Sequence, residues 1–386
     1  MSRIGIIGNV VTPDRVIENS TVLLENKKIV GIIQPNEPEP KVDKSFNFSG
    51  KYIYPGLIDL HLHGVLGQDS TDGDENGLQE IAKFCATCGV TGFLATTVSE
   101  SHSRLKKAIE TASKLVNDTS YAQILGVHLE GPYLSEGRRG AHNAKNLRMP
   151  DFSEIEEFLE INPGLIKRVT LAPELPGSLE LIEYLSNQGV CVSLGHSQAD
   201  QKTCYLAYCK GARLVTHLFN GMDPLNQRKP NLLSFALGFD DITIELIADM
   251  VHVHPDIIKI ALKCKDEEHF IAVSDAVRPT GFPDGEYEFG GETMVVENGI
   301  ARMKTTMSLA GSTSPLNRCL ANLRTHFQIS HPRLSKIGSL IPARLIQMDH
   351  QIGSLEINKI GNIAIFDEEF KCLATFVKGE KVALNE

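Results

Sequence analysis

Short apolar runs alternate with longer amphipathic segments along most of the chain. Eight runs have the length and composition of buried strands, namely Leu57–His61, Thr91–Thr97, Ile124–Glu130, Arg168–Ala172, Val190–Gly195, Leu214–His217, Glu245–Ala248 and Phe270–Ser274. Apolar residues recur every three or four positions in the intervening segments predicted as helices, such as Ser103–Val116, Ser153–Ile161, Leu179–Gln188 and Pro255–Lys263. Eight strands alternating with helices predict an α/β protein with a (β/α)8 TIM-like barrel. A doubly wound open sheet is the alternative, but no Gly-X-Gly-X-X-Gly follows the first strand.

Both ends of the chain contain shorter strand patterns separated by turn residues. The predicted strands are Ile4–Ile7, Thr21–Leu24, Lys28–Ile33, Ser45–Phe48, Asn362–Phe366 and Leu373–Val377. Neither end can cover both faces of a sheet alone, so we expect the two ends to pair into one small β-sandwich domain. The expected division is residues 1–52 and 349–386 for the two parts of this domain and 53–348 for the barrel.

A His-X-His pair lies on the first predicted barrel strand. Leu60 and Leu62 alternate with His61 and His63, which is the two-residue period of a strand. Both histidines therefore project from the same side, close enough to share one metal ion. The alternative is a pair of strand histidines with ordinary hydrogen bonds, and for an isolated His-X-His that is the more frequent case.

Other metal-competent side chains stand at the ends of later strands. Glu130 ends the third predicted strand, His196 follows the fifth, His217 ends the sixth and Asp275 follows the eighth. A barrel gathers the carboxyl ends of its strands around one mouth, where barrel active sites lie. Imidazole and carboxylate ligands without thiolates suit Zn²⁺, with Fe²⁺, Co²⁺ or Mn²⁺ as alternatives. Such an ion would lower the pKa of a bound water and polarise a carbonyl group.

The composition of the chain limits the kinds of partner that we expect it to bind. The chain has 386 residues, with 38 Lys and Arg against 48 Asp and Glu, a formal charge of −10. This balance argues against a nucleic-acid or anionic-membrane partner, and an anionic substrate would need local positive groups. We see no signal peptide and no apolar stretch long enough to span a bilayer. The eight cysteines show no disulfide framework, so we expect a cytoplasmic protein.

Several motifs together resemble the amidohydrolase superfamily and, within it, the N-acetylglucosamine-6-phosphate deacetylase family. They occur in the family's order over essentially the whole chain. The motifs are PGLIDLHLHG at 55–64, HLEGP at 128–132, GHS at 195–197, THLFN at 216–220, SDA at 274–276, GEYEFGG at 285–291 and LAGS at 309–312.

The resemblance implies roles for the strand-end residues. Glu130, His196 and His217 match the ligands of the metal site that the family shares. His61 and His63 match the pair that holds a second ion, together with Glu130 and Asp275, in the members that have it. One or two ions per subunit are therefore expected. Asp275 also matches the catalytic acid and base.

The resemblance also implies a substrate site. His142 matches the histidine that hydrogen-bonds the acyl carbonyl, and it is expected to act in catalysis as well as in binding. Asn220 and Gly221 match contacts to the phosphate, with His252 alongside. Arg228 matches an arginine that reaches the phosphate from the neighbouring subunit, which implies a homodimer.

The implied reaction is hydrolysis of the N-acetyl group of N-acetylglucosamine-6-phosphate to glucosamine-6-phosphate and acetate. A water activated by the metal would attack the amide carbonyl, and Asp275 would shuttle the proton. The chain departs from the usual family pattern at Gly221, Met250 and 313–315, and we place Leu309 beside the substrate. Another N-acyl amino-sugar phosphate or a cyclic amide therefore stays open as substrate. An inactive scaffold is the remote alternative, since barrels can lose activity and keep the fold.

Overall fold

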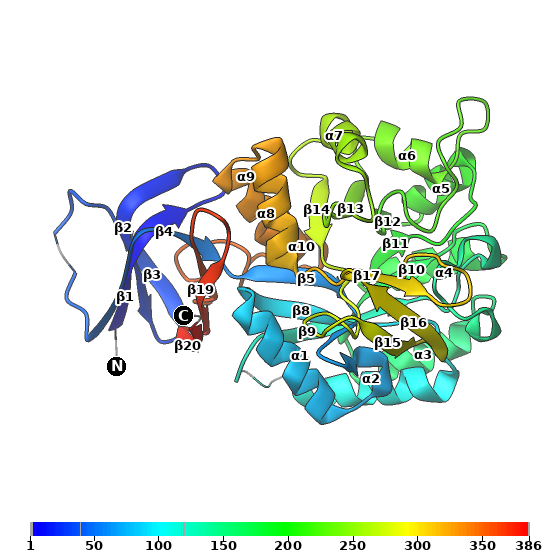
Figure 1. Ribbon diagram of the computed structural model, residues 1–386, viewed down its shortest axis with the longest axis horizontal. Coiled ribbons are helices and arrows are strands. Elements are labelled where there is room, and N and C mark those ends of the chain that lie inside the picture. The colour runs from blue at the N-terminus through cyan, green and yellow to red at the C-terminus, as the bar shows by residue number, and fades with distance from the viewer. Residues whose placement is uncertain (1–2, 39, 117, 119, 385–386) are drawn as a thin grey trace.

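A parallel eight-stranded sheet forms the centre of the computed structural model, which describes residues 3–38, 40–116, 118 and 120–384. The strands neighbour one another in chain order (Figure 1), and they are β5 (Leu57–Leu62), β8 (Val90–Thr97), β9 (Gln123–Glu130), β10 (Ile166–Leu171), β11 (Cys191–Leu194), β12 (Ala212–Val215), β13 (Thr243–Ile247) and β14 (Phe270–Val273). Their residues are nearly all buried, as expected for parallel strands that are covered on both faces. All eight expected barrel strands are confirmed.

The sheet closes into a barrel where the first and last strands meet. The amide of Asp275 donates to the carbonyl of His61 over 2.9 Å, and the amide of His63 donates to the carbonyl of Ala276 over 2.9 Å. The predicted TIM-like barrel is therefore confirmed. These bonds also fix the ends of the first and eighth strands side by side, which brings His61, His63 and Asp275 to one point.

Helices surround the barrel (Figure 1). They are α1 (Glu75–Thr87), α2 (His102–Leu115), α3 (Phe152–Ile161), α4 (Ser178–Asn187), α5 (Gln201–Cys209), α6 (Leu232–Gly238), α7 (Pro255–Cys264), α8 (Leu316–Phe327), α9 (His331–Ser335) and α10 (Ile341–Leu345). Side chains of Asp74, Asp151 and Asp200 accept backbone N–H bonds in the first turns of α1, α3 and α5 and so define where those helices begin. Inward apolar residues of the strands and of α10 fill the end of the barrel away from the mouth.

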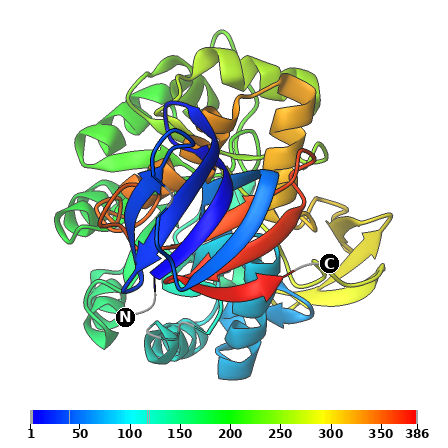
Figure 2. The ribbon, with the colours of Figure 1, turned by 90° about the vertical axis from the view of Figure 1, so that its left-hand side faces the viewer.

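Strands from both chain ends form a second sheet, and Figure 2 shows them lying side by side. Its order is β20 (Glu380–Leu384), β19 (Cys372–Val377), β18 (Ile363–Phe366), β4 (Lys44–Pro55), β1 (Arg3–Val11), β2 (Val16–Glu25) and β3 (Lys28–Ile33). The sheet is continuous and has an apolar core of its own that includes Ile6, Ile53 and Phe376. The predicted pairing of the two ends is thus observed. Residues 1–2, 39 and 385–386 of the expected β-domain lie outside the described part.

A three-stranded antiparallel sheet stands beside the barrel mouth (Figure 1), and the sequence pattern did not lead us to expect it. It consists of β15 (Gly285–Phe289), β16 (Glu292–Glu297) and β17 (Ile300–Met303). Phe289, Met294 and Val296 pack on Val98 and Val277 of the mouth. This small sheet therefore provides a wall over the ends of the barrel strands.

Among the described residues, no helix combines the length and the apolarity that crossing a membrane requires.

Candidate active site

The predicted ligands at three strand ends have an unusual backbone. His196, His217 and Asp275 have φ angles of 47°, 27° and 49°, in the left-handed region that non-glycine residues seldom adopt. Each lies two residues beyond the end of its strand, where the chain turns sharply and aims the side chain into the mouth. Such backbone strain concentrates at functional sites because surrounding structure must hold it in place. The strain therefore marks these residues as a site on grounds independent of residue type.

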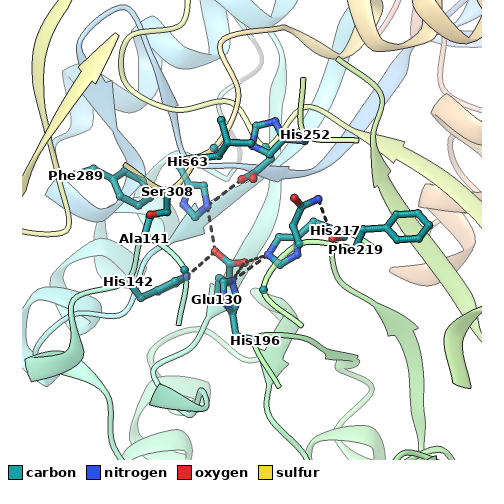
Figure 3. A pocket seen from close by; sticks show the side chains of 16 residues that line it. His63, Glu130, Ala141, His142, His196, His217, Phe219, His252, Phe289 and Ser308 are labelled. Atoms are coloured by element: carbon teal, nitrogen blue, oxygen red, sulfur yellow. Dashed lines mark hydrogen bonds and ion pairs between the residues drawn. The ribbon is translucent and has the colours of Figure 1, made fainter. Parts of the chain in front are cut away.

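Glu130 lies among His63, His142, His196 and His217 (Figure 3). Its Oε2 atom faces the first group of candidate ligands, formed by His61, His63 and Asp275. Oε2 is 3.2 Å from His63 Nε2 and 3.5 Å from His61 Nε2. The two Nε2 atoms are 3.2 Å apart, and each is 3.4 Å from Asp275 Oδ1. Four candidate ligand atoms thus surround one point.

The other oxygen of Glu130 faces a second group. Oε1 is 3.2 Å from His196 Nε2 and 3.1 Å from His217 Nε2, and these two nitrogens are 3.0 Å apart. A single carboxylate therefore stands between two sets of imidazoles, with one oxygen toward each. The structure brings together all six residues that we predicted as metal ligands.

These spacings fit a metal ion at each group. Ligands of a tetrahedral Zn²⁺ with bonds of about 2.0–2.1 Å lie about 3.3 Å from one another. The distances of 3.2–3.5 Å around Glu130 Oε2 have this value, and those around Oε1 are slightly shorter. Two imidazole nitrogens that face each other at 3.2 Å need a proton or a cation between them. The donor set and its spacing therefore suit divalent transition metals.

The hydrogen-bond partner of each histidine Nδ1 indicates whether the Nε2 of that ring has a lone pair for a metal ion or a proton to donate. His61 Nδ1 contacts Glu245 Oε1 at 2.8 Å, and His196 Nδ1 contacts the carbonyl of Arg138 at 2.8 Å. Both partners are acceptors, so each Nδ1 carries the proton, and in the neutral ring the Nε2 lone pair faces Glu130. His142 is the reverse, because its Nδ1 accepts from the backbone N–H of Ser99 over 3.1 Å. Its Nε2 therefore carries a proton.

In this tautomer His142 can donate a hydrogen bond from Nε2, although this atom lies 3.2 Å from Glu130 Oε2 and His142 is near enough to Glu130 and His196 to share a metal ion with them. Burial lowers the pKa of His142 to about 4, so the ring is neutral near pH 7. A protonated Nε2 has no lone pair for a metal. It can donate a hydrogen bond to an oxygen in the cavity.

The electrostatics of the cluster favour a cation. Burial raises the pKa of Glu130, but the positive charge of His61 and hydrogen bonds from His142 lower it well below the ordinary range. Burial lowers the pKa of His63, but hydrogen bonds to Asp275 and Glu130 raise it to about 9. The two carboxylates thus hold positive charge at this point. A divalent ion would replace the protons of the histidines.

The mouth contains a cavity of ≈ 290 Å³ (Figure 3). Five of the residues that we predicted to touch substrate line it, namely His142, Asn220, Gly221, His252 and Leu309. Phe289 and Ser308 from the small sheet and the loop after it complete one side. Among the described residues that line the cavity there is no Lys or Arg. Arg228 is exposed and does not line the cavity within its own chain, and neither do Met250 and 313–315.

His252 is held by a short chain of polar groups. Its Nδ1 lies 2.7 Å from Asp249 Oδ2, which also accepts from Ser312 Oγ over 2.9 Å. Burial raises the pKa of Asp249, but the hydrogen bond and the charge of His252 lower it below the ordinary value. His252 Nε2 is buried without a hydrogen-bond partner among the described residues. A polar group of a substrate in the cavity would satisfy it.

Sequence reasoning missed two charged residues beneath the cluster. Glu245 and Arg168 are fully buried and form an ion pair inside the barrel. Burial raises the pKa of Glu245, but the charges of Arg168 and His61 lower it to about 2. The signal was present, since a charged residue on a strand that is buried on both faces requires a partner.

Comparisons with known proteins agree with this geometry. The model of the amidohydrolase family matches residues 52–382. The N-acetylglucosamine-6-phosphate deacetylase of Vibrio furnissii is 35% identical over 331 residues, which cover 86% of this chain and 82% of that protein. The N-acetylgalactosamine-6-phosphate deacetylase of Escherichia coli O157:H7 is 31% identical, over 91% of this chain and 92% of that protein.

Solved structures of proteins with the same activity in their names are also similar to this chain. A mutant N-acetyl-D-glucosamine-6-phosphate deacetylase from Mycobacterium smegmatis, in complex with N-acetyl-D-glucosamine-6-phosphate, superposes with a TM-score of 0.92. It is 27% identical, and the match covers 99% of each chain. The chain therefore belongs to the amidohydrolase family, in the group that contains these deacetylases.

Proposed function

We propose that the protein is a metal-dependent deacetylase that hydrolyses N-acetylglucosamine-6-phosphate to glucosamine-6-phosphate and acetate. Relatives with this activity in their names match over most of the chain. The observation that carries the proposal is the position of Glu130, with one oxygen toward His61 and His63 and the other toward His196 and His217. This arrangement suits two divalent ions per subunit, with Zn²⁺ as the first choice and Fe²⁺, Co²⁺ or Mn²⁺ as alternatives.

The reaction requires a nucleophile, a donor for the oxyanion and a proton for the leaving amine. When bound, a divalent ion lowers the pKa of a water at this site and polarises the amide carbonyl. The carboxylate of Asp275 takes the proton of the attacking water and returns it to the leaving nitrogen. His142 Nε2–H donates to the acyl oxygen, where negative charge develops. Since Ser99 fixes the tautomer of His142, this donor is in place before the substrate binds.

The sugar phosphate occupies the rest of the cavity. His252 Nε2, which has no partner within the described chain, contacts the sugar or its phosphate, and Asn220 and Gly221 contact the phosphate. Leu309 packs beside the sugar. The described residues that line the cavity include no Lys or Arg, so a dianionic phosphate requires a cationic side chain from elsewhere. Arg228 of a second subunit supplies it, and the active enzyme is a homodimer.

The substrate also indicates a location. A phosphorylated sugar carries charge that prevents it from crossing a membrane unaided, so the enzyme meets it where it is made. We place the protein in the cytoplasm.

A second candidate substrate is the galacto epimer, N-acetylgalactosamine-6-phosphate, because a relative named for this substrate covers almost the same part of the chain. The two sugars differ in the configuration of one hydroxyl group. A buried polar group that is made for one epimer loses its partner with the other. Relative kcat/KM for the two substrates decides between them.

The test is acetate release from each sugar phosphate and from unphosphorylated N-acetylglucosamine, with the protein as purified, after chelation and after metal is restored. We expect turnover of a phosphorylated sugar that is lost with the metal and regained with it. Turnover that survives complete removal of metal contradicts the proposal. A protein without bound metal and without activity is an inactive scaffold.

A further inference from the structure

One carboxylate beneath the cluster contacts ligands of both groups. Glu245 Oε1 lies 2.8 Å from His61 Nδ1 and accepts the backbone N–H of His217 over 3.0 Å. Glu245 comes from β13, which contributes none of the predicted ligands. A single oxygen thus sets the tautomer of a side chain in the first group and the backbone position of a residue in the second.

Arg168 holds this carboxylate from below. It pairs with Glu245 Oε2 and donates to the carbonyl of Leu60 over 3.2 Å and to Thr216 Oγ1 over 3.1 Å. Leu60 precedes His61, and Thr216 precedes His217. Arg168 Nε also donates to Ser193 Oγ over 3.0 Å, so one side chain of β10 connects β5, β11, β13 and the residue that follows β12.

We propose that the Arg168–Glu245 pair is the positioning device of the metal centre, which orients His61 and holds it in register with His217 so that ions bind on both sides of Glu130. The inference rests on the proposed metal-dependent function. Neither residue lines the cavity, so both act through the ligands and neither is catalytic. A carboxylate that accepts from the second nitrogen of a ligating histidine fixes its orientation and increases its basicity.

A purely structural pair would be hard to explain here. Both side chains are fully buried, and burying an ion pair often stabilises a fold no better than well-packed apolar residues would. The contacts are also selective, because four of them reach His61, His217 or the residue directly before one of these ligands. If the pair only stabilised the barrel, its contacts would not be expected to concentrate at His61 and His217.

The test compares Glu245→Gln with the double variant Arg168→Met/Glu245→Gln. The single variant leaves Arg168 unpaired and loses thermal stability, whereas the double variant removes both charges and recovers much of it. Metal content and dissociation constants are measured by elemental analysis and chelator competition. We expect both variants to bind the ion at the His61–His63 side about 10- to 100-fold more weakly than wild type.

Glu154→Gln is the matched control. Glu154 is also a buried carboxylate paired with an arginine, Arg148, and its other partners are Tyr133 and His102. This variant should lose stability and keep wild-type metal affinity. If the double variant recovers its stability and binds metal with wild-type content and affinity, the inference is overturned and the pair has only a structural role. Wild-type protein that binds no metal would instead overturn the proposed function.

Discussion

The assignment of His142 as a donor gives the sharpest prediction about the chemistry. In His142→Asn the shorter amide can still accept from the N–H of Ser99 but no longer reaches the position of Nε2. Removing one preorganised donor to an oxyanion costs about 10²–10³-fold in kcat, or about 2.7–4 kcal/mol. Because the donor acts on charge that develops in the transition state, KM should change little.

His142→Gln is the paired variant, since its longer side chain carries an N–H donor to the position of Nε2 and should recover part of the lost rate. Steady-state acetate release gives kcat and KM, and elemental analysis gives metal content. Both variants should retain wild-type metal, because a histidine whose Nε2 is protonated is no ligand. If His142→Asn loses metal in proportion to activity, His142 is a ligand and the tautomer deduced from Ser99 is wrong.

Changes at Asp275, Arg228 and Met250 probe the proton shuttle, the phosphate site and the strained backbone, respectively. Asp275→Asn should reduce kcat by at least ~10²-fold. Its circular dichroism spectrum should match that of wild type, because Asn tolerates the left-handed backbone at this position. Near-wild-type turnover would exclude Asp275 as the proton shuttle. Arg228→Ala should raise KM for the phosphorylated sugar about 10- to 100-fold with little change in kcat, and an unchanged KM would remove Arg228 from the phosphate site. Met250 has a φ of 68°, a conformation that costs less for Gly than for Ala. The free energy of unfolding measured in urea should therefore be about 1 kcal/mol higher for Met250→Gly than for Met250→Ala. Equal values would mean that the backbone at this position is unstrained.

The barrel strands could be predicted from the sequence because parallel strands that are buried on both faces consist of continuous apolar runs. The eight expected strands match those observed, with ends that differ by one or two residues. The small sheet β15–β17 was missed, although Tyr287 and Phe289 alternate with Glu286 and Glu288 in β15. That alternation is the pattern of a half-exposed strand.

The candidate ligands could be placed at one mouth because each stands at a strand end, which barrel geometry converts into proximity. Their distances, tautomers and backbone angles could not be obtained from the sequence, since they depend on groups remote in the chain such as Ser99 and Glu245. Arg168 and Glu245 were assigned to strands, yet their pairing joins residues 77 positions apart. No local pattern determines such a contact.

We propose that bound metal and the residues around Glu130 together deacetylate a phosphorylated amino sugar. Acetate release from N-acetylglucosamine-6-phosphate, measured beside the unphosphorylated sugar with chelated and metal-restored enzyme, tests it most directly. We expect turnover of the phosphorylated sugar alone, abolished by chelation and regained with about two equivalents of divalent metal per subunit. Undiminished turnover by fully chelated enzyme, or no turnover of any amino-sugar phosphate by metal-loaded enzyme, would contradict it.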